Sequence, residues 1–350
     1  MAEKTNIFSR LPQMLLPWYR ENQRDLPWRQ DKDPYHIWLS EIMLQQTRVE
    51  AVKGYYDRFL QALPTAEALA KADDELLYKL WEGLGYYSRV RNLKKAAQQI
   101  MEQHHGEFPR TYEQILALPG VGEYTAGAVG SIAFGLKTPA VDGNVLRVIS
   151  RLTDDDTPID RPGYKKLVRS CLEAVYPREA GDFTQALMEL GATVCGPNRE
   201  PDCTACPCNE ICMGCQNGTA PQLPVKSPKK QRRQEDMTVF VLRCGDCYAL
   251  QKRPDEGLLA GLWQFPNIPG KKELHDAILK MEEMGLKPIE IMRQVEKKHI
   301  FTHVQWNMSG IFAEVREYAE GFTWMTAQEI NGNAALPTAF RQFWEETGYV

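Results

Sequence analysis

Residues 118–129 read LPGVGEYTAGAV, in which Gly120 and Gly122 follow a Leu-Pro pair and precede a run of small and apolar residues. Upstream, Thr111-x-x-Gln114 has the pattern of a capping box, which predicts a helix that ends at the Leu-Pro pair. Two helices joined by Gly-Val-Gly form a helix-hairpin-helix. The glycines let the backbone approach a phosphate, and the N–H groups that begin the second helix attract the anion. The stretch therefore predicts binding of a nucleic-acid backbone without sequence readout, although a plain helical turn with a glycine cap fits the same letters.

A carboxylate lies on an apolar helical stripe upstream of this hairpin. The Asp-Pro pair at residues 33–34 marks a helix start, and the helix continues as YHIWLSEIMLQQT. Glu41 in this helix has apolar residues at positions i−4, i−3 and i+3. Burial among apolar side chains raises the pKa of a carboxyl, so Glu41 is a candidate proton donor near neutral pH. A glutamate at the edge of the stripe that reaches water or an ion-pair partner is the competing interpretation.

A second carboxylate stands at another predicted helix start. Asp142 and Asn144 flank Gly143 and precede a segment in which apolar residues recur with helical spacing. Either side chain is a candidate N-cap, and capping alone would account for an aspartate here. The helix dipole is expected to keep Asp142 anionic. The chain thus offers one carboxyl whose pKa is expected to be raised and one whose pKa is expected to be lowered, a combination that separates a proton donor from an anion.

The cysteines gather in one loop. Six of the nine fall within 21 residues, namely Cys195, Cys203, Cys206, Cys208, Cys212 and Cys215. One set of four thiolates consists of Cys195, Cys203, Cys206 and Cys212, which are separated by seven, two and five residues. Four thiolates suit a [4Fe–4S] cluster or Zn²⁺. A rival set begins at Cys203 and ends at Cys215, with the spacing of a zinc knuckle, and Cys208 is spare in both. At this density a metal-free loop is not expected.

Composition limits the remaining possibilities. The 350 residues include 42 basic and 46 acidic side chains, a formal net charge of −4 at pH 7, so the overall charge does not suggest a nucleic-acid binder. The longest uncharged apolar stretch, residues 124–136, is too short to span a bilayer. The first residues lack the apolar segment of a secretory signal. We therefore expect no membrane association and a reducing, cytoplasmic location.

The character of the sequence changes after the cysteine loop. Residues 221–236, PQLPVKSPKKQRRQED, are rich in proline and charge, as in a linker. Beyond them, TVFVLRCGDCYALQKR predicts two strands joined by a Gly-Asp turn, and HIFTHVQWNMSGIFAEV repeats the strand alternation. ELHDAILKMEEMG and PTAFRQFWEE predict helices. The sequence thus predicts a mainly α region at 1–216, a linker at 217–236 and an α+β domain at 237–350.

Five motifs carry a resemblance to a known family. WLSEIMLQQT, GLGYYSRVRNL, LPGVGEYTAGAV, VDGNVLRV and the cysteine loop occur in the order found in the helix-hairpin-helix DNA glycosylases, over about residues 12–215. Within that superfamily the chain is most similar to the MutY adenine glycosylase family. The second domain resembles that family's C-terminal Nudix-like domain through GLWQFP and FTH. The chain departs from the family in its first cysteine gap, which is seven residues where six is usual.

The resemblance implies an activity and a set of site residues. It implies that the protein flips adenine out of double-stranded DNA and removes it where it is mispaired with 8-oxoguanine or guanine. It also implies a monomer that associates with the nucleoid in a bacterial-like cytoplasm. It carries Glu41 over as the general acid and base, and Asp142 as the carboxylate that stabilises the oxocarbenium-like sugar, which parallels the two carboxylates of retaining glycosidases. The other implied assignments are Tyr124 and Asn144 in the catalytic site, Gln46, Tyr86, Gly120, Gly122, Arg29 and Thr47 at the DNA, Phe301, Thr302 and His303 at the 8-oxoguanine, and Cys195, Cys203, Cys206 and Cys212 as ligands of a [4Fe–4S] cluster.

The FTH segment has a geometric requirement of its own. On a strand, alternation would place Phe301 and His303 on one face and Thr302 on the other. A loop is therefore needed if all three are to face one base. An ordinary strand end with core and surface residues is the alternative.

Three rival functions remain open. An AP lyase of the endonuclease III type needs a lysine amine, which in that family lies two residues after Gly-Val-Gly, and Tyr124 has that place here. A Nudix pyrophosphatase needs an REx₂EE helix, and the residues after GLWQFP contain HDAILKMEEMG instead. A non-enzymatic Fe–S or DNA-binding protein would have no use for two placed carboxylates. These features favour a monofunctional glycosylase.

Overall fold

The structure is a computed structural model that describes residues 2–197, 200–228 and 231–349, with side chains from residue 6 onward. It divides into two compact units, each built from two pieces of chain. The first unit comprises Met1–Lys71 and Arg91–Lys229, and the second comprises Ala72–Val90 and Lys230–Val350. No helix of the described residues is long and apolar enough to cross a membrane.

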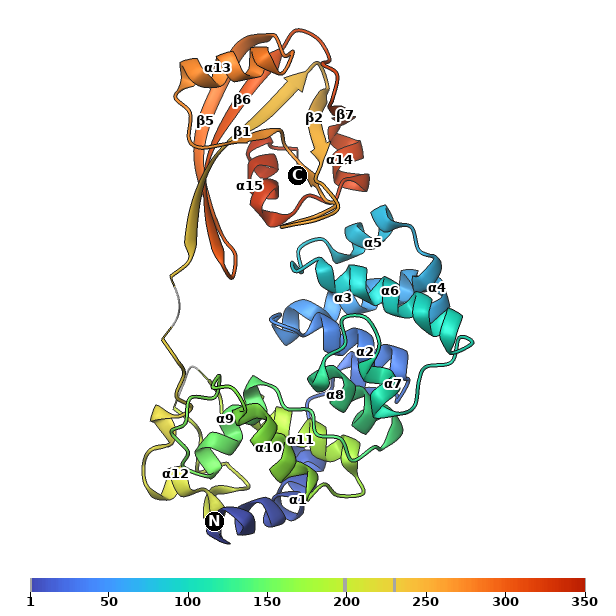
Figure 1. Ribbon diagram of the computed structural model, residues 1–350, viewed down its shortest axis with the longest axis vertical. Coiled ribbons are helices and arrows are strands. Elements are labelled where there is room, and N and C mark those ends of the chain that lie inside the picture. The colour runs from blue at the N-terminus through green and yellow to red at the C-terminus, as the bar shows by residue number, and fades with distance from the viewer. Residues whose placement is uncertain (1, 198–199, 229–230, 350) are drawn as a thin grey trace. The chain divides into compact units, whose positions relative to one another are not determined.

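The first unit is helical (Figure 1). Its elements are α1 (Ala2–Asn22), η1 (Pro27–Arg29), α2 (Pro34–Met43), α3 (Val49–Ala62), α4 (Ala66–Lys71), α6 (Ser88–Gln103), α7 (Tyr112–Leu116), α8 (Glu123–Phe134), α9 (Gly143–Leu152), α10 (Tyr164–Glu173), α11 (Ala180–Thr193), η2 (Asn209–Ile211), α12 (Met213–Gln216) and η3 (Ala220–Gln222). The first turn of α6 belongs to the second unit.

Helices α7 and α8 form the predicted helix-hairpin-helix. The Thr111 hydroxyl accepts a hydrogen bond from the Gln114 N–H at 3.3 Å, and α7 ends at Leu116, slightly before the predicted end. Gly120 has a φ of +76°, and a Cβ at this position would lie 2.6 Å from the Cβ of Asn92, so only glycine fits. Most of α8 is buried, which fixes the hairpin to the core of the unit.

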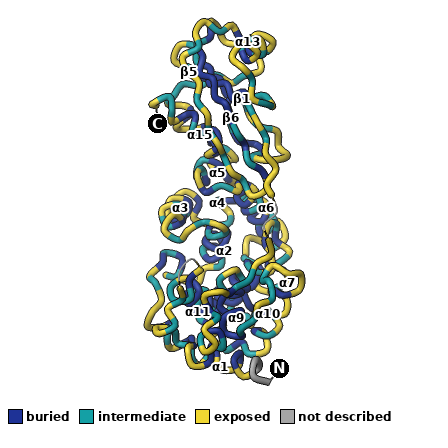
Figure 2. The backbone as a smooth tube through the Cα atoms, turned by 90° about the vertical axis from the view of Figure 1, so that its left-hand side faces the viewer, coloured by how far each residue is buried: buried dark blue, intermediate teal, exposed yellow. Residues whose placement is uncertain are grey.

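Four helices of this unit meet around one space. Helix α2 packs against α8, and α11 packs against both α8 and α9. In α9, Val145, Val148 and Ile149 are buried at the spacing that the sequence predicts. Figure 2 shows this buried interior in dark blue along α9. Polar side chains at the ends of these helices are thereby directed toward a common cavity.

The second unit contains one short helix from the middle of the chain and the whole α+β domain. Its elements are α5 (Asp74–Trp81), β1 (Arg233–Cys244), β2 (Cys247–Lys252), β3 (Trp263–Gln264), β4 (Asn267–Pro269), α13 (Leu274–Glu283), β5 (Pro288–Ile300), β6 (Val304–Val315), β7 (Thr323–Thr326), α14 (Ala327–Asn333), α15 (Thr338–Trp344) and η4 (Glu345–Thr347).

The strands form a mixed sheet with helices on both faces. Its order is β3-β2-β1-β6-β5, with β4 paired to β1 and β7 paired to β2, and β1 runs parallel to β6. Val239 and Val241 of β1 pack with residues of α14 and α15, whereas Phe240 and Leu242 pack with residues of α13. This alternation buries both faces of the sheet between helices (Figure 1).

The α+β class of this part of the chain is confirmed, with some differences in detail. The predicted Gly-Asp turn joins β1 to β2, where Cys244 pairs with Cys247. Strand β1 begins at Arg233, inside the stretch interpreted as a linker, because residues 233–243 pair with residues 304–314 of β6. The segment Ala72–Val90 packs with this unit, and nothing in the local sequence indicated that.

Candidate active site and cysteine cluster

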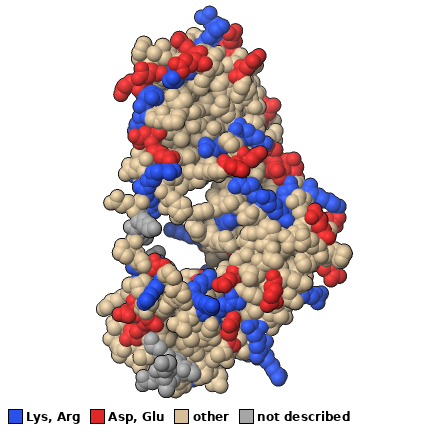
Figure 3. Space-filling view, viewed as in Figure 1, with Lys and Arg blue, Asp and Glu red and all other residues tan. Residues whose placement is uncertain are grey.

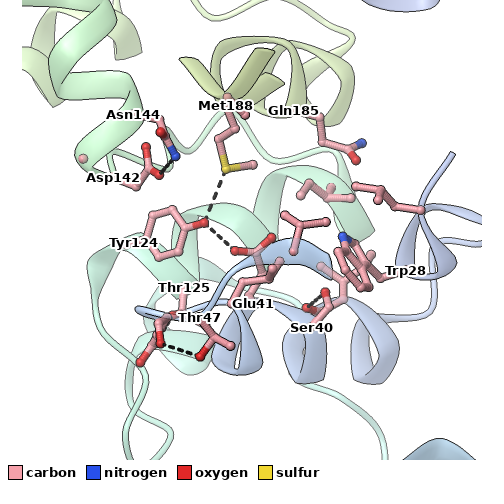
Figure 4. Close-up of a pocket in the computed structure, with 18 of the residues that line it drawn as sticks. Trp28, Ser40, Glu41, Thr47, Tyr124, Thr125, Asp142, Asn144, Gln185 and Met188 are labelled. Atoms are coloured by element: carbon pink, nitrogen blue, oxygen red, sulfur yellow. Dashed lines mark hydrogen bonds between the residues drawn. The ribbon is translucent and has the colours of Figure 1, made fainter. Parts of the chain in front are cut away.

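A cavity of about 790 Å³ in the first unit collects the residues expected to be catalytic. Glu41 reaches it from α2, Tyr124 from α8, and Asp142 and Asn144 from the start of α9. In Figure 4 the Tyr124 ring lies between Glu41 on one side and Asp142 with Asn144 on the other. Residues distant in sequence therefore face one space.

Glu41 is the buried carboxyl that the apolar stripe predicted. It is 5% exposed, and burial raises its pKa from 4.5 to about 7. The Tyr124 hydroxyl donates to Glu41 Oε2 at 2.5 Å, which opposes this rise, whereas the nearby Asp142 adds to it. Tyr124 also lies 3.3 Å from the sulfur of Met188. A carboxyl with such a pKa is protonated in a large fraction of molecules at neutral pH, as a general acid requires.

Asp142 is the N-cap of α9, but the expected direction of its pKa shift is wrong. Its Oδ1 accepts from the Val145 N–H at 2.8 Å, and its Oδ2 accepts from Asn144 Nδ2 at 2.7 Å. These bonds and the charge of Arg147 favour the anion, yet burial outweighs them and raises the pKa of Asp142. The helix-start argument considered only the dipole, whereas the depth of the cavity dominates.

Hydrogen bonds connect Asp142 to the cysteine loop. Asn144 Oδ1 accepts from Arg147 Nη2 at 2.8 Å, and Arg147 Nε donates to the Cys195 carbonyl at 2.8 Å. Arg151 Nη1 donates to the Cys195 sulfur at 3.2 Å. Asp142 and the cysteine loop are thus linked through side chains on one face of α9.

Five of the six clustered cysteines surround a small cavity of about 20 Å³, which also touches α9 and α11. They are Cys195, Cys203, Cys206, Cys212 and Cys215. Cys208 is buried but does not line the cavity, in agreement with its being spare in both predicted sets. The cavity does not distinguish the two predicted ligand sets, because Cys195, which belongs to one, and Cys215, which belongs to the other, both line it. No three His, Cys, Asp or Glu side chains in the described parts of the chain are placed to hold a single metal ion.

Of the residues expected at the DNA, four line the rim of the cavity that Glu41 and Asp142 face: Gln46, Thr47, Gly120 and Gly122. Gln46 is exposed and has a φ of +59°, a strained backbone for a non-glycine residue and a frequent sign of a functional position. Arg29, also expected at the DNA, lines the same cavity and is held by a buried carboxylate there. Its Nη2 donates to Oε2 of Glu189 at 2.7 Å, which makes it part of the cavity wall.

The sequence reasoning missed the contribution of α11 to this cavity. Gln185, Met188 and Glu189 line it, and Trp28 lines it from η1 (Figure 4). Glu189 is fully buried and is held by both Arg24 and Arg29. A signal was available, since Gln185 and Glu189 are four residues apart on one helix and only Ala, Leu and Met lie between them. Lys165 of α10 also lines the cavity, a cation that the sequence reasoning did not consider.

The remaining predicted site residues lie in the second unit. Phe301, Thr302 and His303 form the turn between β5 and β6, so the loop that the FTH segment requires is present. Phe301 packs edge-on against Trp306 with ring centroids 4.8 Å apart, whereas Thr302 and His303 are exposed. The Tyr86 hydroxyl lies 2.7 Å from Thr302 Oγ1.

Comparison with known proteins identifies the class to which the chain belongs. Residues 39–175 match the family model described as HhH-GPD superfamily base excision DNA repair protein, and residues 238–346 match the NUDIX domain model. The first unit is similar to a solved thermostable thymine-DNA glycosylase, with 31% identity and a TM-score of 0.54 over 62% of this chain and 98% of that one. An endonuclease III–DNA covalent intermediate, at 24% identity and a TM-score of 0.52, shares the fold. The catalytic unit is that of a helix-hairpin-helix DNA glycosylase.

Curated relatives identify the family within this class of DNA glycosylases. The adenine DNA glycosylase of Mus musculus is 36% identical over 94% of this chain and 76% of its own length, and that of Homo sapiens is 36% identical over 94% and 72%. The adenine DNA glycosylase of Buchnera aphidicola from Acyrthosiphon pisum is 32% identical over 90% and 89%. The chain belongs to the adenine DNA glycosylase family and is a base excision repair enzyme.

Proposed function

We propose that the enzyme hydrolyses the N-glycosidic bond of adenine mispaired with 8-oxoguanine or guanine in double-stranded DNA. The observation that carries this proposal is the pair of carboxyls, the buried Glu41 and the half-buried Asp142, on two sides of one cavity that is large enough for a flipped-out base. The rim supports the DNA part of the proposal, because Gly120, Gly122 and the N-terminus of α8 can approach a phosphate.

The wall of the cavity suits a purine. Trp28 and the Tyr124 ring supply flat apolar surfaces, and the Gln185 amide can both donate and accept at the edge of a base. Arg24 donates to both oxygens of Glu189, from Nε at 2.7 Å and from Nη2 at 3.0 Å, and Arg29 donates from Nη2 at 2.7 Å. This buried ion pair keeps the wall rigid and the carboxylate anionic, since the pKa of Glu189 is lowered by the bonds from its arginines despite its burial.

The reaction we propose uses the two carboxyls in different protonation states. The Tyr124 O–H is bonded to Glu41 Oε2, so the acidic proton is assigned to Oε1. Glu41 gives that proton to the adenine ring as the bond from the base to C1′ breaks, and the leaving group departs as neutral adenine. The Asp142 carboxylate faces the positive charge that develops on the sugar. Glu41, now ionised, accepts a proton from the water that attacks C1′.

We further propose that the enzyme leaves an intact abasic strand. The lysine of a lyase would form a Schiff base, and Tyr124 occupies the position after Gly-Val-Gly where the lyase family has it. Lys165 is the amine to test, because it lines the same cavity from α10. If borohydride trapping yields a covalent adduct, its loss in Lys165→Ala would identify this side chain as the nucleophile and overturn the monofunctional assignment.

The cysteine loop fits a [4Fe–4S] cluster. The donor set is all thiol, the ligand type of such a cluster, and its members line one cavity. We propose that Cys195, Cys203, Cys206 and Cys212 would hold the cluster. When bound, it would supply four covalent bonds that fix the loop. Arg147 and Arg151, which contact Cys195, tie this loop to α9.

Metal analysis of the purified protein tests this assignment. We expect about four iron and four sulfide per chain for a cubane cluster. Cys215→Ser is expected to retain the iron, and Cys195→Ser to lose it, because only Cys195 belongs to the proposed set. One equivalent of zinc without iron, or loss of iron in Cys215→Ser, would contradict the assignment.

We propose that the turn of residues 301–303 recognises the base opposite the adenine. Adenine is a normal base, so the cavity alone cannot distinguish a mispair from A:T. The exposed Thr302 and His303 can exchange hydrogen bonds with the C8 carbonyl and N7–H that distinguish 8-oxoguanine from guanine. Phe301 anchors the turn to the core through Trp306 and is the packing residue of the three.

A panel of duplexes tests the proposed function. With A:8-oxoguanine, A:G, A:C and A:T duplexes under single-turnover conditions, we expect the fastest adenine release from A:8-oxoguanine, slower release from A:G, and little from A:T. Thr302→Ala combined with His303→Ala is expected to reduce the preference for A:8-oxoguanine over A:G and to leave adenine chemistry largely intact. Equal rates on all four duplexes would refute opposite-base recognition, and no release from any would refute the activity.

A further inference from the structure

A strained loop of the second unit presents Tyr86. Gly85 and Tyr86 have φ values of +68° and +47°, and a positive φ is unfavourable for an aromatic residue. The loop holds this shape because Arg89 Nη2 and Trp81 Nε1 donate to the Gly85 carbonyl, each at 3.1 Å. The Arg89 guanidinium also lies over the rings of Trp81 and Tyr86. The Tyr86 side chain remains 46% exposed, so the strain is maintained at an accessible side chain.

Two distant pieces of chain meet at the hydroxyl of Tyr86. Its oxygen lies 2.7 Å from Thr302 Oγ1 in the turn between β5 and β6, and either hydroxyl can be the donor. Tyr86 belongs to the piece Ala72–Val90, whereas the turn belongs to the α+β domain. Nothing covalent near this contact fixes the distance between the two hydroxyls, so it depends on how the first piece is attached to the second.

Glu82 makes that attachment, four residues before Tyr86. Its Oε1 accepts from the Leu336 N–H at 3.0 Å and from Arg341 Nη2 at 2.5 Å. Its Oε2 pairs with Lys79 at 2.8 Å, and Lys79 also donates to the Ala334 carbonyl at 3.5 Å. The Glu82 side chain is only 11% exposed. A carboxylate that is largely removed from water and bonded on both oxygens fixes its partners more firmly than a surface ion pair does.

A second, more exposed contact supports the same attachment. Glu75 of α5 pairs with Lys252 and accepts from Trp263 Nε1 at 3.2 Å. Tyr78 lies against Gly261, where an added Cβ would be 3.3 Å from the tyrosine oxygen. Glu75 and Lys252 are well exposed, so solvent screens their attraction. Glu82 is therefore the contact that determines where the loop with Tyr86 sits.

We propose that Glu82 is a positioning residue for recognition of the base opposite the adenine. It sets Tyr86 against Thr302, so that the two act as one surface toward that base. This inference rests on the proposed recognition role of the turn. Specificity of this kind requires polar groups that are held to within about 0.5 Å. Tyr86 and Thr302 belong to two separate pieces of chain, so a rigid connection between these pieces is needed to hold the two hydroxyls in place.

Glu82→Gln and Arg341→Gln in the full-length protein test the proposal by changing each partner of the Glu82–Arg341 ion pair in turn. Glutamine keeps an acceptor for the Leu336 N–H and removes the charge that Lys79 and Arg341 neutralise. We expect the ratio of single-turnover rates on A:8-oxoguanine and A:G to fall about tenfold in each variant, because misplacement of the order of 1 Å is costly at such contacts. The rate on A:G is expected to stay within about twofold, since A:G gains less from the turn.

Glu346→Gln is the matched control. Glu346 also pairs with one lysine and one arginine, Lys297 and Arg293, in the same unit, but it joins neighbouring elements of the α+β domain. Its rate ratio is expected to remain that of the wild type. Tyr86→Phe removes the hydroxyl that meets Thr302, and combining it with Glu82→Gln is expected to lower the ratio no further than the stronger single change does.

The outcomes separate the possible failures. An unchanged ratio in both Glu82→Gln and Arg341→Gln would overturn the positioning role, as would an equal fall in Glu346→Gln or a parallel loss of rate on both duplexes. Should Glu82→Gln fail to fold, Arg341→Gln decides alone, because Lys79 still balances the Glu82 charge in that variant. A wild-type enzyme without any preference would instead refute the recognition role of the turn, and the inference with it.

Discussion

Replacing Glu41 by glutamine is expected to lower the single-turnover rate of adenine release by about 10²–10⁴-fold, the range that general acid catalysis contributes. The amide has nearly the shape of the carboxyl and can still accept the Tyr124 hydrogen bond at its oxygen. It cannot give up a proton to the leaving base. Binding of the A:8-oxoguanine duplex, measured by gel shift or fluorescence anisotropy, is expected to stay near the wild-type value.

Stability provides the control for this variant. Burial raises the pKa of Glu41 from 4.5 to about 7, so this carboxyl costs stability progressively as the pH rises from 4.5 to 7, and the full cost remains above pH 7; an uncharged glutamine is expected to leave thermal stability unchanged or slightly higher. Leu39→Met, on the same helix, alters a fully buried side chain that does not line the cavity, and serves as the matched packing control. A Glu41→Gln enzyme with near-normal rate would exclude Glu41 as the acid.

Asp142→Asn is expected to lower the rate by about 10²–10³-fold, the size of effect seen when one group that stabilises developing charge is removed. Asparagine is as good an N-cap as aspartate, so the bond to the Val145 N–H is retained. What is lost is the negative charge that faces the sugar. Rapid-quench measurement of base release on A:8-oxoguanine, with a thermal melt of the same sample, distinguishes chemistry from capping.

Asp33→Asn is the matched cap substitution. Asp33 caps α2, the helix that carries Glu41, and its Oδ1 accepts from the Tyr35 N–H at 2.8 Å. Because it lies outside the catalytic cavity, its replacement is expected to change neither rate nor stability appreciably. If Asp142→Asn melted far below the wild type while Asp33→Asn did not, capping and burial of Asp142 would account for the residue better than charge stabilisation does.

The sequence predicted local features of the site well, because local spacing reports burial. The apolar neighbours of Glu41 along one helix indicated burial and a raised pKa but left open a glutamate that reaches water or an ion-pair partner; the structure shows the burial and the raised pKa. The place of Gly120 after Leu-Pro predicted that it lies in the turn of a helix-hairpin-helix. Its positive φ, and the lack of room for a Cβ beside Asn92, explain why glycine is needed there. In both cases the deciding feature is local, namely the spacing of apolar residues along one helix and a turn whose backbone has a positive φ.

Features that depend on distant elements were not predicted. The pKa of Asp142 is raised by burial in a cavity whose walls come from other helices, which the sequence around residue 142 does not report. Gln185 reaches the cavity because α11 packs on both α8 and α9. The attachment of Glu82 to Arg341 joins residues more than 250 positions apart, and no periodicity carries that information.

The most direct test of the account is the pH dependence of single-turnover adenine release from an A:8-oxoguanine duplex, measured with the full-length enzyme between pH 5 and 9. Glu41 must be protonated to act, and its pKa is about 7, so the rate is expected to be high below pH 7 and to fall about tenfold per unit above it. Asp142 must be ionised, so the rate is expected to decline again at the acid end. A rate that rises as the pH passes upward through 7, or no adenine release at any pH, would contradict the account.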